Sequence, residues 1–299
     1  MRTVKTPREV RASLRPGRLA GKRIGFVPTM GALHEGHASL LRLARGRTDL
    51  VVASIFVNPK QFGPGEDYAR YPRDAARDAA LLDSLGCDLL FLPDTEDLYS
   101  PANRTRITVE GLSEALCGAS RPGHFGGVAL VVAKLMNIVQ PDEAYFGQKD
   151  AQQAVIIQRM AADLDVPVRI VVAPTVREAD GLAMSSRNVY LDRDSRARAA
   201  SIPAALRLVR ERIEQGERRV EPLVALMRQT LGERGVAVDY CEIVDGATLR
   251  PLSAVAGTVL VACAGTVGST RLIDNIALGV AGAEVREVVL EFPEWSAYG

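Results

Sequence analysis

The chain has 299 residues, of which 47% are hydrophobic, 24% charged and 5% aromatic, and 37 basic against 36 acidic side chains give a net charge of +1. These proportions exclude the disordered, collagen-like and fibrous classes. The near balance of charge argues against a protein whose main task is to coat nucleic acid or an anionic membrane. For this length the expectation is about two domains.

The first part of the chain alternates strand and helix patterns. Thr6 and Pro7 suit the N-cap and first turn of a short helix. A continuous apolar run over 50–57 is typical of a strand buried on both faces. Further strands are predicted over 23–27, 88–92, 143–146 and 168–172, and helices over 38–47, 74–85, 128–139 and 151–164. This alternation predicts an α/β fold, with a Rossmann-like, doubly wound parallel sheet over residues 1–175.

A different pattern begins at residue 176. Arg- and Ala-rich helical patterns cover 193–215 and 220–234, and β-type runs follow over 238–244, 258–262 and 271–278. The stretch 285–292 is expected to add an edge strand. Helices followed by clustered strands predict a smaller α+β domain over residues 176–299.

The cysteines and the N-terminus bear on the compartment. The longest apolar stretch, 128–139, contains Lys134 and is too short to span a bilayer, and no apolar segment follows Met1. The four cysteines are scattered without a C-x-x-C pair, as is typical of thiols in a reducing compartment. They are Cys87, Cys117, Cys241 and Cys263. The sequence therefore predicts a cytoplasmic protein without a membrane or nucleic-acid partner.

The first candidate site is the segment 28–37, PTMGALHEGH, where a buried strand ends and a helix begins. Backbone N–H groups at a helix N-terminus favour an anion, and glycines let a ligand approach the backbone. His34 and His37 can each donate a hydrogen bond to a phosphate oxygen. Their spacing of three is one short of the H-E-x-x-H zinc helix, and a structural turn is the other alternative.

Four further polar segments precede predicted helices or follow predicted strands. In 146–153, Lys149 can meet a phosphate as a point charge, and Gln153 lies one helical turn further on. The segment 180–188 carries two hydroxyls and a guanidinium, which together make an oxyanion clamp. The other two are 58–63, which follows a buried strand, and 120–127, which opens an apolar helix. A solvated loop or a helix cap is the structural alternative for each.

Taken together, these segments resemble the pantothenate synthetase (pantoate–β-alanine ligase) family. The resemblance covers about residues 3–278 and rests on five motifs in order, namely PTMGALHEGH, FVNPKQF, RPGHF, FGQKDAQQ and DGLAMSSRN, with RLIDN near the end. HEGH and MSSR resemble the HIGH and KMSKS-type signatures of a wider nucleotidyltransferase superfamily. One departure is Gly126, where members of the family commonly carry Arg.

The resemblance implies a two-step ligase reaction. The carboxylate of (R)-pantoate attacks the α-phosphorus of ATP, giving pantoyl adenylate and pyrophosphate, and the β-alanine amine then attacks the acyl carbon, giving pantothenate and AMP. It implies ATP and Mg²⁺, a homodimer, pantoate binding by Gln61 and Gln153, and His37 as proton donor. The implied catalytic residues are His34, His37, Lys149 and Arg187. The implied ATP site comprises Met30, Gly31, Ala32, Leu33, His34, Glu35, Gly36, His37, Gly147, Gln148, Lys149, Asp150, Val176, Met184, Ser185, Ser186 and Arg187.

Two alternatives stay open on the sequence. One is another enzyme of the superfamily, such as a mononucleotide adenylyltransferase or a tRNA-charging synthetase. The near-neutral charge argues against tRNA as a partner. The other is a nucleotide sensor that keeps the fold without catalysis. A measurement of pyrophosphate release from ATP separates these three functions. Release that requires pantoate indicates the ligase, release that requires a mononucleotide indicates another transferase, and no release indicates a sensor.

Overall fold

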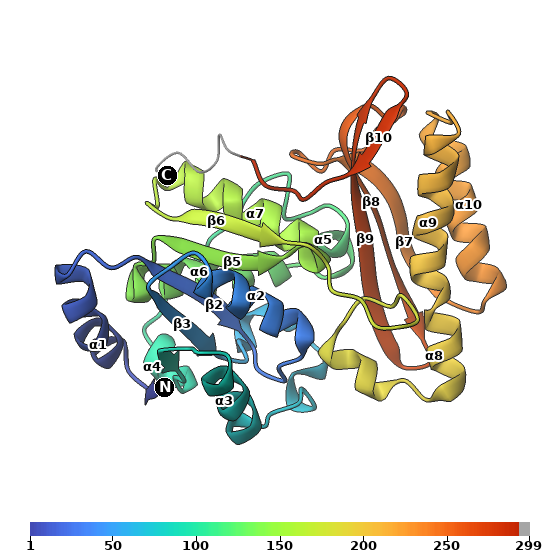
Figure 1. The fold of residues 1–299 in the computed structure, drawn as a ribbon. Coiled ribbons are helices and arrows are strands. Elements are labelled where there is room, and N and C mark those ends of the chain that lie inside the picture. Colours follow the sequence, from blue (N-terminus) through green and yellow to red (C-terminus); the bar gives the residue numbers. More distant parts are fainter. Residues whose placement is uncertain (293–299) are drawn as a thin grey trace.

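The computed structural model describes residues 1–292, which form two sheets flanked by helices (Figure 1). The first sheet has six strands in the order β1-β4-β3-β2-β5-β6, and every pair is parallel. Its strands are β1 (Arg2–Val4), β2 (Ile24–Thr29), β3 (Leu50–Ile55), β4 (Leu89–Phe91), β5 (Glu143–Gly147) and β6 (Arg169–Ala173). The predicted parallel α/β sheet is confirmed, and β1, which the sequence analysis missed, adds its edge strand.

Helices cover both faces of this sheet because successive residues of a strand point to opposite sides. Phe26 of β2 and Val52 of β3 belong to the core cluster on the side of α1, α6 and α7. Val27 and Val51, their neighbours in sequence, belong to the cluster on the side of α2 and α3. The helices are α1 (Pro7–Leu19), α2 (Glu35–Arg45), α3 (Ala75–Ser84), α4 (Thr95–Leu98), α5 (Cys117–Ser120), α6 (His124–Val139) and α7 (Ala151–Asp163).

Helix α1 begins as its sequence predicts. The Thr6 hydroxyl accepts from the backbone N–H of Glu9, and the Glu9 carboxylate accepts from the backbone N–H of Thr6. This reciprocal capping box satisfies donors that the first turn of a helix leaves unpaired. Pro7 occupies the first turn, where its missing N–H has no cost.

The second sheet is antiparallel, in the order β10-β9-β8-β7, and helices α9 and α10 pack on one face. Its strands are β7 (Ala237–Asp245), β8 (Gly257–Val267), β9 (Thr270–Ala281) and β10 (Glu284–Glu287). The helices are α8 (Arg193–Ala199), α9 (Ser201–Glu214) and α10 (Val220–Glu233). The predicted α+β character is confirmed, while the division at residues 175 and 176 stays a prediction.

Two predictions for this region need correction. The single helix predicted over 193–215 is divided at Ala200. Pro203 has no N–H to give to the carbonyl of Ala199, and its ring clashes with that carbonyl in a continuous helix. The edge strand predicted over 285–292 is shorter, since β10 ends at Glu287 and residues 288–292 leave the sheet.

The strand order places the candidate segments at one edge. In the first sheet β2 lies between β3 and β5, so the chain crosses to opposite sides after β2 and after β4. Ligands of such sheets sit beyond the carboxyl ends of the strands, where this reversal occurs. The segments after β2, β3, β5 and β6 all leave the sheet at that edge.

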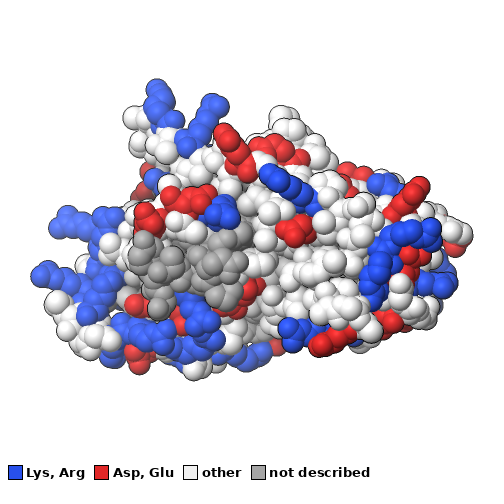
Figure 2. Space-filling model, turned by 90° about the horizontal axis from the view of Figure 1, so that it is seen from above, with Lys and Arg blue, Asp and Glu red and all other residues white. Residues whose placement is uncertain are grey.

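Neither the charges on the surface nor the cysteines indicate a particular ligand. Basic and acidic side chains are interspersed over the face seen in Figure 2. No helix within residues 1–292 is long and apolar enough to cross a membrane. All four cysteines are buried and free of disulfide bonds.

Candidate active site

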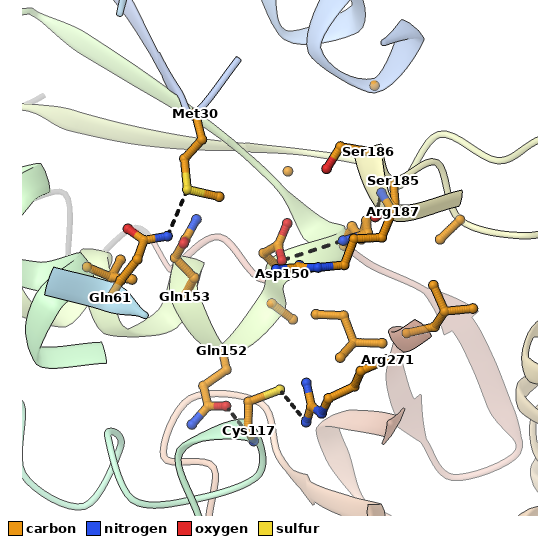
Figure 3. A pocket seen from close by; sticks show the side chains of 18 of the residues that line it. Met30, Gln61, Cys117, Asp150, Gln152, Gln153, Ser185, Ser186, Arg187 and Arg271 are labelled. Atoms are coloured by element: carbon orange, nitrogen blue, oxygen red, sulfur yellow. Dashed lines mark hydrogen bonds and ion pairs between the residues drawn. The ribbon is translucent and has the colours of Figure 1, made fainter. Parts of the chain in front are cut away.

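A cavity of about 720 Å³ lies at the carboxyl edge of the parallel sheet, and the second domain closes its other side. It brings together the four predicted segments that follow β2, β3, β5 and β6 (Figure 3). The predicted residues on its wall are Met30, His34, Gly36, His37, Gln61, Gly147, Lys149, Asp150, Gln153, Val176, Met184, Ser185, Ser186 and Arg187.

His34 and His37 cap the first turn of α2 with their imidazole rings. Nδ1 of His34 accepts from the backbone N–H of Gly36 at 3.1 Å, and Nδ1 of His37 accepts from the backbone N–H of His34 at 3.3 Å. The ring centroids are 4.2 Å apart. Because Nδ1 is an acceptor in both rings, each neutral imidazole carries its proton on Nε2. The cap therefore leaves one N–H donor per ring for a ligand.

Both imidazoles are neutral at pH 7 in this cavity. Burial, and then the positive charge of Lys149, lowers the pKa of His34 to about 4. Burial, and then the charges of His34 and Lys149, lowers the pKa of His37 to about 3. The rings are thus hydrogen-bond donors in a cavity whose standing positive charge comes from other side chains.

The loop before α2 offers fewer backbone donors than the sequence analysis expected. The buried carboxylate of Asp78 on α3 accepts from the backbone N–H of Ala32 at 2.7 Å and of Leu33 at 2.9 Å. Gly31 has a φ of +81°, and a Cβ there would meet an Asp78 oxygen at 2.9 Å. Gly31, Ala32 and Leu33 do not line the cavity, nor does Glu35, whose carboxylate pairs with Arg42 on the surface.

Lys149 projects from η3 (Gln148–Asp150), a short 3₁₀ helix between β5 and α7. Its ammonium lies 3.6 Å from an Asp150 oxygen, and the side chain is 20% exposed. The side-chain amide of Asn275 on β9 donates to the carbonyls of Gln148 and Lys149 at 3.1 and 2.9 Å. Gln148, predicted to bind ATP, is instead buried outside the cavity wall. The second domain therefore fixes the loop that carries the lysine.

The amide of Gln61 is oriented by its neighbours in the loop after β3. Its Oε1 accepts from Asn58 at 3.0 Å, so its NH₂ faces the cavity, where the sulfur of Met30 is a weak acceptor at 3.0 Å. The side-chain oxygen Oδ1 of Asn58 accepts from the Tyr99 hydroxyl at 3.0 Å. Gln153 projects from α7 beside Gln61 (Figure 3). The two glutamines thus form an amide-lined end of the cavity.

The RPGHF segment, of which Arg121, His124 and Phe125 also line the cavity, holds this loop in place. Nδ1–H of His124 donates to the carbonyl of Gln61 at 2.7 Å, and its Nε2 accepts from Arg121 at 3.0 Å. Arg121 in turn forms a salt bridge with Glu66 at 2.6 Å. A Cβ on Gly127 would lie 2.2 Å from the carbonyl oxygen of Lys60, so this close approach of helix and loop requires glycine.

Residues 176–190, here called the lid loop after their predicted role, line one side of the cavity. The Arg187 guanidinium forms a bidentate pair with Asp67, at 2.8 and 2.9 Å. The hydroxyls of Ser186 and Tyr71 are 3.3 Å apart. At the base of the loop, Arg177 pairs with the buried carboxylate of Asp274 at 2.7 and 3.1 Å. The loop is therefore closed against residues 67–71 at one end and anchored on β9 at the other.

Several cavity residues had no local signal in the sequence. Asp67 begins a short 3₁₀ helix, η2 (Asp67–Ala69), Tyr71 lies in the loop after it, and Asp274 and Asn275 lie within a strand. The far end of the cavity is lined by Cys117 and Arg271, whose side chains approach to 3.6 Å (Figure 3). Only the RLIDN motif, which contains Arg271, Asp274 and Asn275, indicated in advance that β9 takes part.

The comparisons with known proteins agree with this geometry. A model of the pantoate–beta-alanine ligase family matches residues 2–277. The pantothenate synthetase of Heliobacterium modesticaldum is 53% identical over 281 residues, which is 94% of this chain and 100% of that protein. That of Pseudomonas fluorescens is 52% identical over 94% of this chain and 99% of its own length.

Solved structures give the same result. A crystal structure of pantothenate synthetase from Thermus thermophilus superposes with a TM-score of 0.86 at 50% identity, covering 92% of this chain and 98% of that one. Pantoate–beta-alanine ligase from Francisella tularensis, in complex with beta-gamma ATP and beta-alanine, gives a TM-score of 0.77 at 35% identity, covering 92% and 97% of the two chains.

Proposed function

The chain belongs to the pantoate–beta-alanine ligase family, and on that premise we propose that it condenses pantoate with β-alanine through a pantoyl adenylate formed from ATP. It is a ligase of pantothenate synthesis. The observation that carries the mechanism is the convergence of four segments, distant in the sequence, on one cavity. Its wall carries Lys149, the Nε2–H donors of His34 and His37, and the amides of Gln61 and Gln153, a set that suits a triphosphate beside a small hydroxy acid.

In the first step a pantoate carboxylate oxygen attacks the α-phosphorus, and the bond to the leaving pyrophosphate breaks. Negative charge grows on the phosphoryl oxygens, so catalysis depends on positioning and charge stabilisation. Lys149 supplies the positive charge, and the Nε2–H groups of His34 and His37 supply directed hydrogen bonds. The resemblance implied that His37 is a proton donor. Because Nδ1 of His37 accepts a backbone hydrogen bond, the donating atom of this role is Nε2. In the structure Arg187 is paired with Asp67. It can bind a phosphate oxygen once it releases that carboxylate.

Gln61 and Gln153 are suited to hold pantoate. Its two hydroxyls and carboxylate need neutral donors and acceptors, which two amides provide. Asn58 and His124 hold Gln61 in place before any substrate binds. A site built to pair such hydroxyls strongly disfavours analogues that lack them, because the amides are then left unpaired.

In the second step the β-alanine amine attacks the acyl carbon, and AMP leaves. Acyl adenylates hydrolyse readily, so the site must exclude water between the two steps. The lid loop supports this role, since Ser186 and Arg187 contact Tyr71 and Asp67, which also line the cavity.

The residues fit Mg²⁺ carried by the triphosphate rather than a cage of protein ligands. Residues 1–292 contain no group of three or more His, Cys, Asp or Glu side chains placed to hold a metal. Mg²⁺ commonly takes one or two carboxylates together with substrate phosphates and water. Asp150 lines the cavity with a side chain 47% exposed and lies 3.6 Å from the Lys149 ammonium, whereas Glu66 and Asp67 are each held in a shorter pair with arginine. Asp150 would hold the ion, which when bound would neutralise charge on the leaving pyrophosphate.

Pyrophosphate release tests the proposed function. The purified chain is incubated with ATP and Mg²⁺, with pantoate, with a mononucleotide, or with no second substrate. Pantoate-dependent release, followed by AMP and pantothenate when β-alanine is added, is the expected result. Release that depends on a mononucleotide identifies another transferase, and ATP binding without release under any condition identifies a sensor.

Assembly and location complete the proposal. We expect a homodimer in the cytoplasm, with the edge of the parallel sheet as the interface. Light scattering coupled to size-exclusion chromatography measures the mass of the particle, and a mass near 32 kDa, that of one chain, contradicts the dimer.

A further inference from the structure

Residues 288–292, here called the strap, lie beyond residue 277, where the match to the family model ends. The strap leaves β10 and runs toward α7 and β6 of the first domain (Figure 1). The backbone N–H of Val288 still donates to the carbonyl of Ala277 on β9 at 2.9 Å. The segment therefore connects the two domains.

Leu290 anchors the strap between the domains. Its side chain is completely buried and belongs to the core cluster that includes Val155 of α7 and Leu260 of β8. A Cβ on Gly246, in the second domain, would lie 3.0 Å from a methyl group of Leu290. Burial of a leucine side chain removes its apolar surface from water and so stabilises the folded chain. The strap is thus held by the core and not only by surface contacts.

Two buried glutamines of the first domain bind the strap backbone. Gln158 on α7 donates to the carbonyl of Leu290 at 2.8 Å and accepts from the N–H of Phe292 at 3.0 Å. Oε1 of Gln148 accepts from the N–H of Leu290 at 3.0 Å. Both glutamine side chains are at least 90% buried, so an amide without its partner would be costly.

Gln148 links the strap to the lysine loop. Its Nε2 donates to Oδ1 of Asn275 at 3.3 Å, and Nδ2 of Asn275 donates to the carbonyls of Gln148 and Lys149. The backbone on which Lys149 stands is therefore fixed from the strap on one side and from β9 on the other. No strap residue lines the cavity itself.

We infer that the strap and Gln148 are positioning elements for Lys149, which act on adenylate formation without touching the substrates. The inference rests on the proposed function, because it assigns the strap to the adenylation step. It predicts that loss of the strap lowers kcat for pyrophosphate release and leaves the KM for ATP within about twofold, since the cavity wall stays complete.

The test compares a chain ending at residue 292 with a chain ending at residue 287. Both lack residues 293–299, so their difference reports on the strap alone. Single-turnover formation of pantoyl adenylate, without β-alanine, is expected to be at least tenfold slower in the shorter chain. In the Lys149→Ala background the same truncation is expected to change the rate less than twofold, because the positioned group is gone.

Equal rates in the two chains overturn the inference, and so does a tenfold loss that persists in the Lys149→Ala background. If the shorter chain does not fold, Gln158→Ala in the full chain replaces it, since this change removes two of the three glutamine hydrogen bonds to the strap, leaves that of Gln148, and keeps the cavity wall intact. About a threefold slower adenylation is then expected, again abolished by Lys149→Ala. An unchanged rate contradicts the inference.

Hydrogen–deuterium exchange separates this inference from the proposed function. Peptides covering residues 146–151 are expected to exchange faster in the chain ending at 287 than in the chain ending at 292, whether or not ATP is consumed. Unchanged exchange refutes the strap's role while leaving the ligase activity standing. If the full-length chain makes no adenylate, but exchange still differs between the chains ending at 292 and 287, the proposed activity alone is refuted.

Discussion

The two domains contribute to the cavity in different ways. In the parallel sheet every strand ends at the same edge, so the segments after β2, β3 and β5 bring His37, Gln61 and Lys149 to one place. In the antiparallel sheet strand ends alternate between edges, and the contribution comes mainly from the first half of β9, with isolated residues of β7 and β8. There Asp274 and Asn275 hydrogen-bond mainly to other protein groups.

The two kinds of sheet therefore place different kinds of group at the cavity. Loops at strand ends present side chains to a ligand, and on the proposed mechanism they carry the chemistry. A strand interior presents side chains at fixed intervals, which suits it to hold a neighbouring loop. Changes in the first domain should therefore affect the chemical step, and changes on β9 should affect stability and alignment.

The largest effect is expected for His37→Ala. Loss of the Nε2–H donor should lower adenylate formation by about 10²–10⁴-fold. Exchange of pyrophosphate into ATP in the presence of pantoate measures this step. His37→Gln is the matched control, because an amide N–H can stand near Nε2 and should recover part of the rate. Exchange at the wild-type rate in His37→Ala would rule out the assigned role.

Asp274→Ala should mainly lower the free energy of unfolding. The change leaves Arg177 without the buried carboxylate that it binds through two hydrogen bonds. Breaking such a pair costs about 3–5 kcal/mol. Urea unfolding measures the loss, and Glu214→Ala, which breaks the exposed pair with Arg210, should cost less than about 1 kcal/mol. Similar losses in the two variants would contradict the anchoring role of β9.

Stability should also fall with acidification, and the effect should come from the first domain. The chain's three histidines all lie there, and burial, followed by neighbouring positive charge, lowers the pKa of His124 to about 4, as it does for His34. Below pH about 6.5 the histidines bind protons in the unfolded chain but stay neutral in the folded chain. The free energy of unfolding therefore decreases as the pH falls from about 6.5 to 4.

At pH 5 this loss reaches as much as about 2 kcal/mol for each histidine. Urea unfolding at pH 7 and pH 5 measures it, and each single His→Gln variant should flatten the pH dependence by its own share. A free energy of unfolding that is constant between these pH values would show that the rings are not held neutral.

The smallest effect is expected at the lid loop. Tyr71→Phe removes the hydroxyl that lies 3.3 Å from Ser186. A hydrogen bond of this kind contributes about 0.5–1.5 kcal/mol, so the KM for ATP should rise about two- to tenfold with little change in kcat. Tyr68→Phe is the control, since Tyr68 lies in the same segment and does not line the cavity. Equal effects of the two changes would argue against lid closure through Tyr71.

The site segments could be predicted because their signals are local. Each polar motif directly follows an apolar strand, and parallel strands place such segments together. The role of Asp78 could not be predicted in this way. It lies on an Ala-rich helix 45 residues from Leu33, and nothing near it indicates that its carboxylate takes the backbone donors assigned to ATP.

The conformation of the strap could not be predicted either, because its partners are still more distant in the sequence. Residues 285–292 read as one short β-type run, and only the first part pairs with β9. What removes the rest from the sheet is the partnership of Leu290 with Gln148 and Gln158, which are more than 130 residues away. Local patterns indicate the type of an element, whereas partners this distant are set by the assembled core.

The strap also has a consequence for biosynthesis. A ribosome makes the chain from its N-terminus, so Leu290 emerges after every strand and helix described here has been translated. Until then the buried amides of Gln148 and Gln158 lack the partners they have in the finished protein. The lysine loop therefore reaches its final placement only when translation is nearly complete, and in a nascent chain stalled before residue 288 the loop that carries Lys149 would lack its contacts with Leu290.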